Sequence, residues 1–256
     1  MLNLLYAGLL GIVEGITEFL PISSTAHLIL TAKLLNLPQT EYLKSFEIII
    51  QLGAISSVVV LYWKQLWQWE VIKRLIVAFI PTGIIGLIAY KFAKQYLLGN
   101  TSVVLWTLLI GGILIIIFEY LYKEGESGSQ EMATISYKQC LAIGLFQSVA
   151  IVPGVSRSAA TVIGGLLLGL NRKTIVEFSF LLAVPTMLAA SGLDLIKSAD
   201  QFSKDQVGFL AVGFVVSFVV ALLSIKFLLR YIKNHDFKAF GIYRIAIAIL
   251  LWLGMK

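Results

Sequence analysis

Residues 11–28, GIVEGITEFLPISSTAHL, decide how this chain folds, because they interrupt an apolar helix with charged groups and a proline. Glu14 and Glu18 are four residues apart, so a helix presents them on one face. Pro21 ends that helix. Four polar residues that can cap or line a second helix follow it: Ser23, Ser24, Thr25 and His27. Ionisable side chains at membrane depth are costly, so we expect this stretch to be functional.

The composition of the whole chain indicates an integral membrane protein. Its 256 residues are 59% hydrophobic and 13% charged, with a mean hydropathy of +0.91. Apolar runs of roughly 20 residues recur, which is the length that a helix needs to cross a bilayer, and they lack the alternation of a membrane β-barrel. The net charge of +6 suits contact with anionic lipid. The sequence lacks the mixture of basic and aromatic residues that is typical of nucleic-acid binding. Cys140 is the single cysteine, so the chain cannot form an internal disulfide. We therefore expect an all-α integral membrane fold.

The apolar runs and their breaks define the expected helices. Two broken helix pairs are expected, over 3–20 with 24–36 and over 137–152 with 156–170. Spanning helices are expected at about 45–63, 75–92, 102–122, 174–196, 207–229 and 240–253. An interrupted pair can dip into the membrane and return to the same side. The sequence therefore predicts six transmembrane helices and two re-entrant helix pairs.

The two halves of the chain resemble each other. The most polar stretch, residues 123–136 (KEGESGSQEMATIS), divides a single membrane domain over 1–256 into repeats of about 1–122 and 137–256. Residues 21–26 (PISSTA) correspond to residues 153–159 (PGVSRSA) with one insertion. Three crossings per half give the halves opposite orientations. We therefore expect an inverted-topology repeat whose site forms where the broken helices meet.

The counterpart of the first stretch is IVPGVSRSAAT, residues 151–161, with Arg157 among hydroxyl groups. The hydroxyl residues around this arginine are Ser156, Ser158 and Thr161. At the start of a helix, free backbone N–H groups, hydroxyls and a guanidinium form a site for an anion, most naturally phosphate. Ser23 and Thr25 add donors from the first stretch. The alternative is that Arg157 only pairs with Glu14 or Glu18 and holds the halves together.

Together the two stretches supply the parts of a phosphoryl-transfer site. The two carboxylates can hold a divalent cation, which bridges phosphate oxygens. Ser24 or His27 can attack phosphorus, or His27 can act as base for Ser24 or for water, and the residues leave these alternatives open. Glu47 and Gln51, four residues apart, either support the site from behind or make ordinary helix hydrogen bonds.

Hydrolysis of a phosphate on a lipid fits these parts best. A transporter or flippase of a phosphorylated lipid is the alternative from another class, because inverted repeats with broken helices are also a transporter architecture. A flippase needs the phosphate clamp but not two carboxylates beside a serine and a histidine. A set of purely structural buried ion pairs is a third interpretation, and it leaves the hydroxyl clusters unexplained.

These motifs resemble those of the undecaprenyl-pyrophosphate phosphatase family, known for bacitracin resistance. The resemblance rests on EGITEFLPISSTAH (residues 14–27) and PGVSRSAAT (residues 153–161), and it extends through FEIIIQLGAI (residues 46–55) over essentially the whole chain. It implies a bacterial inner-membrane enzyme that converts undecaprenyl diphosphate to undecaprenyl phosphate, the carrier reused in peptidoglycan synthesis. It also implies dependence on Mg²⁺ or Ca²⁺ and an active site open to the periplasmic side.

Carried onto this chain, the resemblance implies roles for six residues. They are an acidic pair, a catalytic hydroxyl and imidazole, and a phosphate-binding pair: Glu14 and Glu18, Ser24 and His27, Ser156 and Arg157. Glu14 and Glu18 would also hold the metal. The choice among Ser24, His27 and water as nucleophile stays open, as does a homo-oligomeric state.

Charges that flank the expected spans indicate the orientation. Lysine and arginine are more numerous on the face that includes Lys73, Arg172 and Lys238, so we place that face in the cytoplasm. Glu119 and Arg244 fall near span ends, where we expect them to snorkel to the interface. Arg244 has a second interpretation, a contact with lipid phosphate.

Overall fold

A computed structural model describes residues 3–38, 40–93, 97, 100–122, 131–198 and 207–254, and within these ranges every regular element is a helix. The α-helices are α1 (Leu4–Thr17), α2 (Ser24–Leu34), α3 (Glu41–Leu61), α4 (Trp63–Leu66), α5 (Trp69–Phe92), α6 (Thr101–Leu121), α7 (Tyr137–Ser148), α8 (Arg157–Leu167), α9 (Arg172–Ser198), α10 (Val207–Tyr231) and α11 (Lys238–Gly254). Two short 3₁₀ helices, η2 (Met132–Thr134) and η3 (Val149–Ile151), flank α7. Most of the predicted linker over 123–136 lies outside the described residues. The all-α prediction is confirmed.

Long helices form where the sequence has long apolar runs. Within the described ranges, five helices are long and apolar enough to cross a membrane: α3, α5, α6, α9 and α10. The sixth predicted span corresponds to α11, whose 17 described residues make about 25 Å of helix against a hydrocarbon core of about 30 Å, so that span stays a prediction. Large apolar side chains such as Leu87 and Ile88 face outward, which suits lipid as the solvent. The chain is a multi-pass membrane protein.

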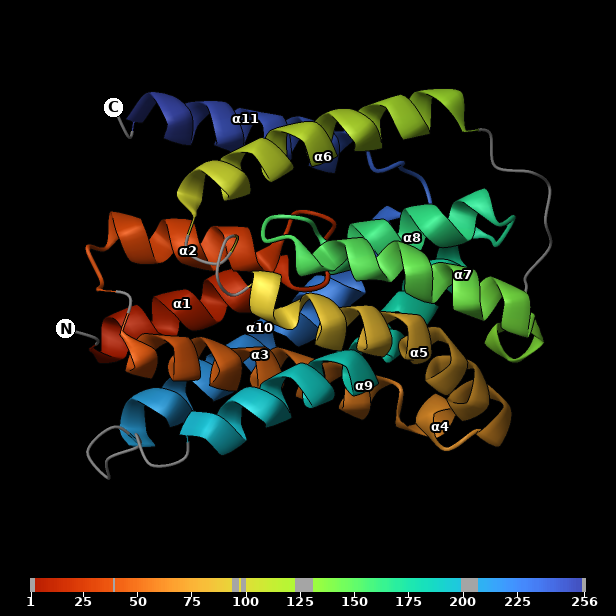
Figure 1. Ribbon diagram of the computed structural model, residues 1–256, viewed down its shortest axis with the longest axis horizontal. Coiled ribbons are helices and arrows are strands. Elements are labelled where there is room, and N and C mark those ends of the chain that lie inside the picture. Colours follow the sequence, from red (N-terminus) through yellow and green to blue (C-terminus); the bar gives the residue numbers. More distant parts are fainter. Residues whose placement is uncertain are drawn as a thin grey trace.

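Two helix pairs are broken close to the predicted positions, although α1 and α7 end three and four residues before the predicted ends at 20 and 152. α1 ends at Thr17, and Ser23 caps α2 by accepting a hydrogen bond from the Ala26 N–H. α7 begins with a capping box between Ser136 and Gln139. In Figure 1, α1 runs from the left end to the middle and α2 returns to that end, whereas α7 enters from the right end and α8 returns there. Both turns therefore lie in the middle of the molecule.

Each helix that leads into a break packs against a long helix from the other half of the chain. α1 contacts α10, and α7 contacts α5. Glycines permit this approach: a Cβ on Gly15 would lie 2.8 Å from the Ser217 carbonyl oxygen, and one on Gly144 would lie 2.0 Å from that of Ala78. Close packing of small residues stabilises helix pairs in lipid. The two breaks are thus held by contacts between the halves.

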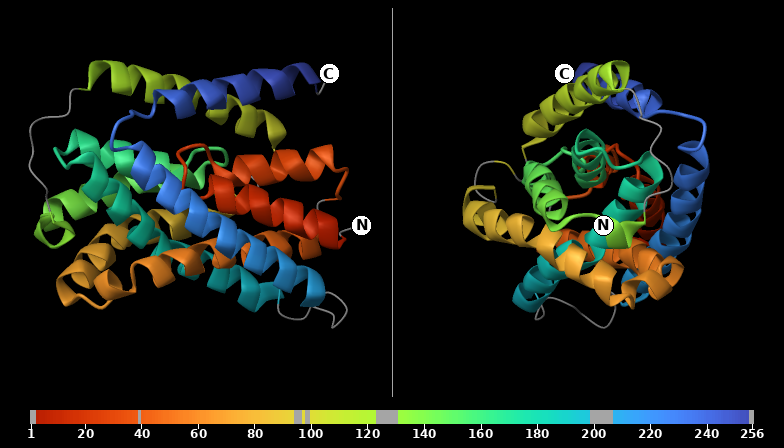
Figure 2. Two further views of the ribbon diagram at one scale, coloured as in Figure 1. Left: turned by 180° about the vertical axis from the view of Figure 1, so that it is seen from behind. Right: turned by 90° about the vertical axis from the view of Figure 1, so that its right-hand side faces the viewer.

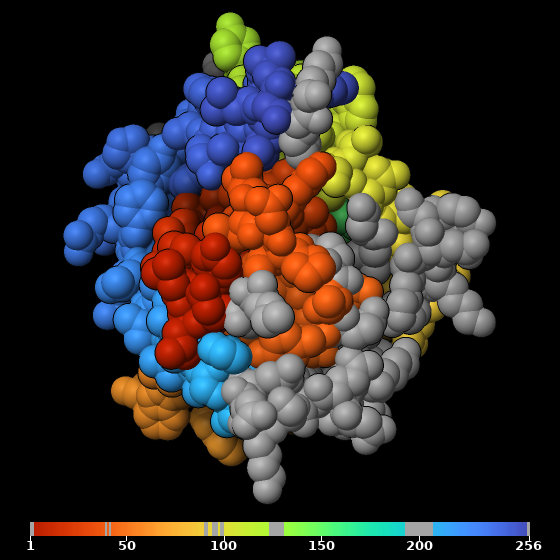
Figure 3. Space-filling view, turned by 90° about the vertical axis from the view of Figure 1, so that its left-hand side faces the viewer, coloured from red at the N-terminus to blue at the C-terminus, as the bar shows by residue number. Residues whose placement is uncertain are grey.

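The remaining helices enclose the broken pairs. Seen end-on in Figure 2, α3, α5, α9 and α10 surround them, and α6 and α11, which contact each other, cover the last face. Figure 3 shows the end at which α1 begins, with α1 and α2 lying beside α10 and α11. In the interior, the Phe19 ring meets that of Phe180 edge to face, with centroids 5.3 Å apart. This packing anchors the first turn against α9.

Candidate active site

The two turns contact each other, so the structure brings the two polar stretches together. In the second turn, Ser158 Oγ donates a hydrogen bond of 3.0 Å to the Leu20 carbonyl oxygen of the first turn, and Ser156 Oγ donates to the same oxygen at 3.5 Å. Ser156 also caps α8 by accepting from the Ala159 N–H at 3.2 Å. Both serines are buried. Their hydroxyls therefore join the turns, in addition to any phosphate contact.

Glu18 is the central residue of the site. Its Oε2 accepts a hydrogen bond of 2.6 Å from Ser24 Oγ, and its Oε1 accepts one of 3.0 Å from Arg157 Nη2. Arg157 Nη1 donates to the Ser179 carbonyl oxygen on α9 at 2.9 Å, while its buried Nε has no partner. The ion pair predicted as an alternative exists, with Glu18 as the acid. Because Glu18 also binds Ser24, the pair does more than join the halves.

Glu14 lies one helical turn before Glu18 on α1 and is fully buried. No donor group hydrogen-bonds to either of its carboxylate oxygens, whose nearest polar neighbour is the carboxylate of Glu18, and Glu47 Oε1 on α3 is also buried and unpartnered. Glu14 is close enough to Glu18, Glu47 and Arg157 to interact with their charges. A buried carboxylate without partners is costly. These free oxygens therefore suit a cation.

The donor set can be compared with what a divalent ion requires. Among the described residues, no group of three or more His, Cys, Asp or Glu side chains is arranged to hold a metal. Mg²⁺ is commonly bound through one or two carboxylates, with water and substrate phosphates as further ligands. Glu14 and Glu47 have free oxygens, whereas both oxygens of Glu18 already accept hydrogen bonds. Gln51, one turn after Glu47, is half-buried. The residues fit a hard cation that shares its shell with phosphate.

His27 does not hydrogen-bond to Ser24. Its Nδ1 lies 2.7 Å from the Ser23 carbonyl oxygen, and its Nε2 lies 2.9 Å from the hydroxyl of Tyr243 on α11. A carbonyl oxygen can only accept, so Nδ1 carries the proton and donates. The structure thus places Ser24 against Glu18 and gives His27 a partner, Tyr243, that sequence reasoning missed.

The other predicted phosphate donors lie around the turns. Thr25 is half-buried in the first turn of α2, and Ser23 Oγ accepts from the Ala26 N–H. Thr161 Oγ1 donates to the Arg157 carbonyl oxygen at 2.8 Å and lies 3.4 Å from Gln147 Oε1. In this arrangement, the Thr161 hydroxyl supports α8.

Gln147 precedes Pro153 by six residues, much as Glu14 precedes Pro21 by seven, so it occupies the corresponding place in the second half. Its Nε2 donates to the hydroxyls of Thr82 and Thr186 at 3.0 and 3.1 Å, and its Oε1 lies 3.4 Å from the Thr161 hydroxyl. This buried cluster is neutral and hydrogen-bonded. Among the described residues, the fully buried carboxylate oxygens without a hydrogen-bond partner, those of Glu14 and Glu47, lie in the first half. At these corresponding positions the two halves therefore differ chemically despite their similar sequences.

Arg244 does not snorkel, and that prediction is wrong. The side chain is 1% exposed, and it donates hydrogen bonds to backbone carbonyl oxygens of both turns and of α6. The acceptors and distances are Pro21 at 3.3 Å, Gly154 at 3.0 Å, Thr107 at 3.0 Å and Leu108 at 3.4 Å. The space for the guanidinium comes from Gly111, where a Cβ would lie 2.3 Å from Nη2. Gly111 on α6 is therefore the residue in the sequence that could have indicated room for a buried arginine side chain.

Glu119 is also buried, and its predicted snorkelling is wrong. Arg172 at the start of α9 binds it through both terminal guanidinium nitrogens, Nη1 and Nη2, with Nη2 3.0 Å from Oε2. The Phe237 N–H donates to Glu119 Oε1 at 3.0 Å. This ion pair fastens the end of α6 to α9 and to the segment before α11.

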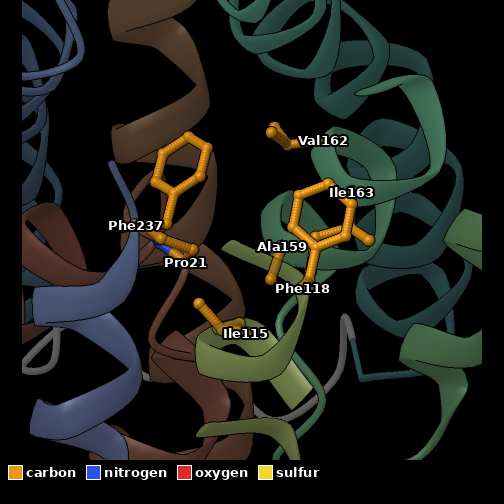
Figure 4. Close-up of a pocket in the computed structure, with 7 residues that line it drawn as sticks. All are labelled: Pro21, Ile115, Phe118, Ala159, Val162, Ile163 and Phe237. Carbon is orange, nitrogen blue, oxygen red and sulfur yellow. The ribbon is translucent and has the colours of Figure 1, made fainter. Parts of the chain in front are cut away.

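A small cavity lies behind the first turn (Figure 4). Only apolar residues line it, and they come from α6, α8, the first turn and the segment before α11: Pro21, Ile115, Phe118, Ala159, Val162, Ile163 and Phe237. Arg157 and Thr161 lie on the opposite face of α8 from Ala159 and Ile163 by helical spacing. The cavity is therefore a packing gap next to the turn and is separate from the polar site.

Fold and site together define a multi-pass helical membrane protein with carboxylates, a serine and an arginine at its buried centre. The chain belongs to the family described as bacitracin resistance protein BacA, whose model matches residues 7–250. It is 52% identical over 245 residues to the undecaprenyl-diphosphatase of Aquifex aeolicus, with 95% of each chain covered. It is 51% identical to that of a Sulfurihydrogenibium species, covering 97% of this chain and 98% of the relative. It is 46% identical to the undecaprenyl-diphosphatase of Campylobacter jejuni, covering 97% of this chain and 93% of the relative.

Proposed function

We propose that this protein hydrolyses undecaprenyl diphosphate to undecaprenyl phosphate and inorganic phosphate, which recycles the lipid carrier for peptidoglycan synthesis and confers bacitracin resistance. Family membership and relatives with the name undecaprenyl-diphosphatase over nearly the whole chain support this activity. The single observation that carries the mechanism is the position of Glu18 between Ser24 and Arg157.

The reaction uses the residues of both turns. Arg157 and the N–H groups at the starts of α2 and α8 bind the terminal phosphate, since helix N-termini favour anions. Ser24 Oγ attacks the terminal phosphorus, its proton passes to Glu18, and undecaprenyl phosphate leaves with the bridging oxygen. Water then attacks the phosphoserine, which releases inorganic phosphate and returns the proton to Ser24. Positioning and charge neutralisation supply most of the acceleration in such transfers.

A divalent cation, Mg²⁺ or Ca²⁺, fits the acidic part of the site. Glu14 would hold it, together with Glu18 as the sequence predicts or with the free oxygen of Glu47. When bound, the ion neutralises charge on the diphosphate oxygens. Ser156, Ser158, Thr161, Ser23 and Thr25 surround the phosphate position as hydrogen-bonding groups.

The fold is best interpreted as an inverted-topology repeat of residues 1–122 and 137–256 within one membrane domain. The broken pairs α1–α2 and α7–α8 enter from opposite ends (Figure 1), and α1 packs on α10 as α7 packs on α5. On this proposal the broken pairs are re-entrant and α11 is the sixth span. The protein would lie in the bacterial inner membrane with its site open to the periplasmic face. Both turns come from one chain, so the reaction needs no second copy.

The test is release of inorganic phosphate from undecaprenyl diphosphate by the purified protein in detergent, with and without a chelator. We expect release that the chelator abolishes and that Mg²⁺ or Ca²⁺ restores. Arg157→Ala should remain folded and lose the activity. A flippase of the same architecture would instead move prenyl phosphate between vesicle leaflets without releasing phosphate, and that result would replace the proposal.

A further inference from the structure

α11 reaches the site through Tyr243. The Tyr243 hydroxyl lies 2.9 Å from His27 Nε2. The two rings are stacked at 7° with centroids 5.6 Å apart. His27 is buried, whereas Tyr243 is 40% exposed. The phenol therefore bridges the buried imidazole and the surface of the protein.

The hydrogen bonds of His27 fix its tautomer. Nδ1 donates to the Ser23 carbonyl oxygen at 2.7 Å, so in the neutral ring Nε2 has only a lone pair and the Tyr243 hydroxyl donates to it. If the ring gains a proton, Nε2 can donate to the phenolic oxygen instead. The hydroxyl can serve both states, and the imidazole keeps its hold on Ser23 in each of them.

The hydrogen bond from His27 to the Ser23 carbonyl oxygen matters for the reaction because Ser23 directly precedes Ser24. The Ser23 φ of 73° is in a region that residues other than glycine seldom adopt, and such backbone persists only where the surroundings fix it. The next residue is Ser24, whose hydroxyl binds Glu18. On the other side of the turn, Arg244 binds the Pro21 carbonyl oxygen. Adjacent residues of α11 thus hold the first turn on both sides of Ile22.

We propose that Tyr243 is a positioning residue, which orients His27 so that the imidazole holds Ser23 and thereby sets the direction of the Ser24 hydroxyl. This inference rests on the proposed function. On this proposal Tyr243 acts through its hydrogen bond to His27 and not on phosphate or metal, so its loss should lower kcat while leaving KM unchanged.

The decisive variant is Tyr243→Phe, which removes the hydroxyl and keeps the stacked ring. We expect kcat for undecaprenyl diphosphate to fall about tenfold, the usual order for a lost hydrogen bond that orients a catalytic group. In the His27→Ala background the same change should have no further effect, because residues that act as one unit are not additive. Tyr231→Phe is the matched control: Tyr231 stacks on the exposed His235, and its change should leave kcat as in the wild type.

A second measurement does not depend on turnover. The chain has only two histidines, so ¹⁵N spectra of imidazole-labelled protein can be assigned with His235→Gln. We expect His27 to be protonated on Nδ1, and its Nε2 signal to shift in Tyr243→Phe but not in Tyr231→Phe. Wild-type kcat in Tyr243→Phe, an unchanged Nε2 signal, or a further loss on top of His27→Ala would overturn the inference. A wild-type protein that releases no phosphate would overturn the proposed function, while the spectra would still decide whether Tyr243 binds His27.

Discussion

The Ser24 hydroxyl donates a hydrogen bond of 2.6 Å to Glu18 Oε2. The other oxygen of the same carboxylate binds Arg157, which is 139 positions away in the sequence. Glu18 can therefore accept the serine proton and at the same time hold the guanidinium in place. A base must lie within hydrogen-bond reach of the proton that it takes. Glu18 meets that condition in the structure, whereas His27, the base that the sequence suggested for Ser24, does not.

Glu18→Gln should lower kcat for phosphate release by about 100- to 10,000-fold, the range that a general base contributes. The amide can still hydrogen-bond to Ser24 and Arg157 but cannot take the proton. The measurement is steady-state phosphate release in detergent, with thermal unfolding to show that the variant is folded. Glu131→Gln, at an exposed position, is the control and should behave as the wild type. A folded Glu18→Gln enzyme with kcat near the wild-type value would exclude Glu18 as the base.

Trapping distinguishes the three nucleophiles. Undecaprenyl diphosphate labelled in the terminal phosphate should leave label on the protein that survives acid and is lost in base, as phosphoserine does. Ser24→Ala should abolish this label, while His27→Ala should retain it. A label that is lost in acid and survives base would identify His27 as the nucleophile, and the absence of label at high turnover would indicate direct attack by water.

The breaks and the five long spans could be predicted because their causes are local. Pro21 and the serines after it interrupt one helix whatever the rest of the chain does. The length of each apolar run directly indicates whether its helix can cross the membrane. The meeting of the two turns could be predicted only through the repeat. The sequence could not predict which of Glu14 and Glu18 pairs with Arg157, because the two are four residues apart on the same helical face. The position of α8 against α1 decides which carboxylate the guanidinium reaches.

Glu14→Gln tests the metal site. Glu14 has two unpartnered oxygens, so its neutralisation should weaken binding of Mn²⁺, used as a probe for Mg²⁺, on the order of tenfold. Electron paramagnetic resonance of free Mn²⁺ measures this without turnover. In chelator the variant should unfold at a temperature no lower than the wild type, because a buried, unpaired charge has been removed. Unchanged Mn²⁺ affinity would show that the cation lies elsewhere.

Arg244 and Glu119 show why position along a helix misleads. Each falls near the end of an apolar run, where a charged side chain usually reaches the interface, yet both are buried. Arg244 can be buried because Gly111 on α6 leaves room for its guanidinium. Glu119 can be buried because Arg172 on α9 pairs with its carboxylate. Neither cause is visible within the segment that carries the residue.

Arg244→Lys should destabilise the protein by about 3 kcal/mol, because an ammonium cannot reach carbonyls in three separate segments and leaves some of them unsatisfied. Activity should fall as well, since the two turns lose their common anchor. Thermal or denaturant unfolding in detergent measures the first effect. Arg230→Lys, at an exposed position on α10, should change neither. Equal stability of Arg244→Lys and the wild type would show that the carbonyl contacts contribute little.

The buried pair of Glu119 and Arg172 should matter for stability rather than for chemistry. Glu119→Gln leaves Arg172 without its counter-charge in a region with little water, and breaking one side of a buried pair costs about 3–5 kcal/mol. Glu70→Gln is the matched control: Glu70 pairs with Lys73 and Arg74 in the same chain, but at the surface, where ion pairs contribute little. Glu119→Gln should therefore unfold at a clearly lower temperature, whereas the control should match the wild type.

Below its melting temperature Glu119→Gln should keep the wild-type KM and kcat, because α6 binds the second turn through Thr107, which donates to the Pro153 carbonyl oxygen at 2.8 Å. A loss of kcat in a fully folded Glu119→Gln protein would instead show that the pair controls the geometry of the two turns.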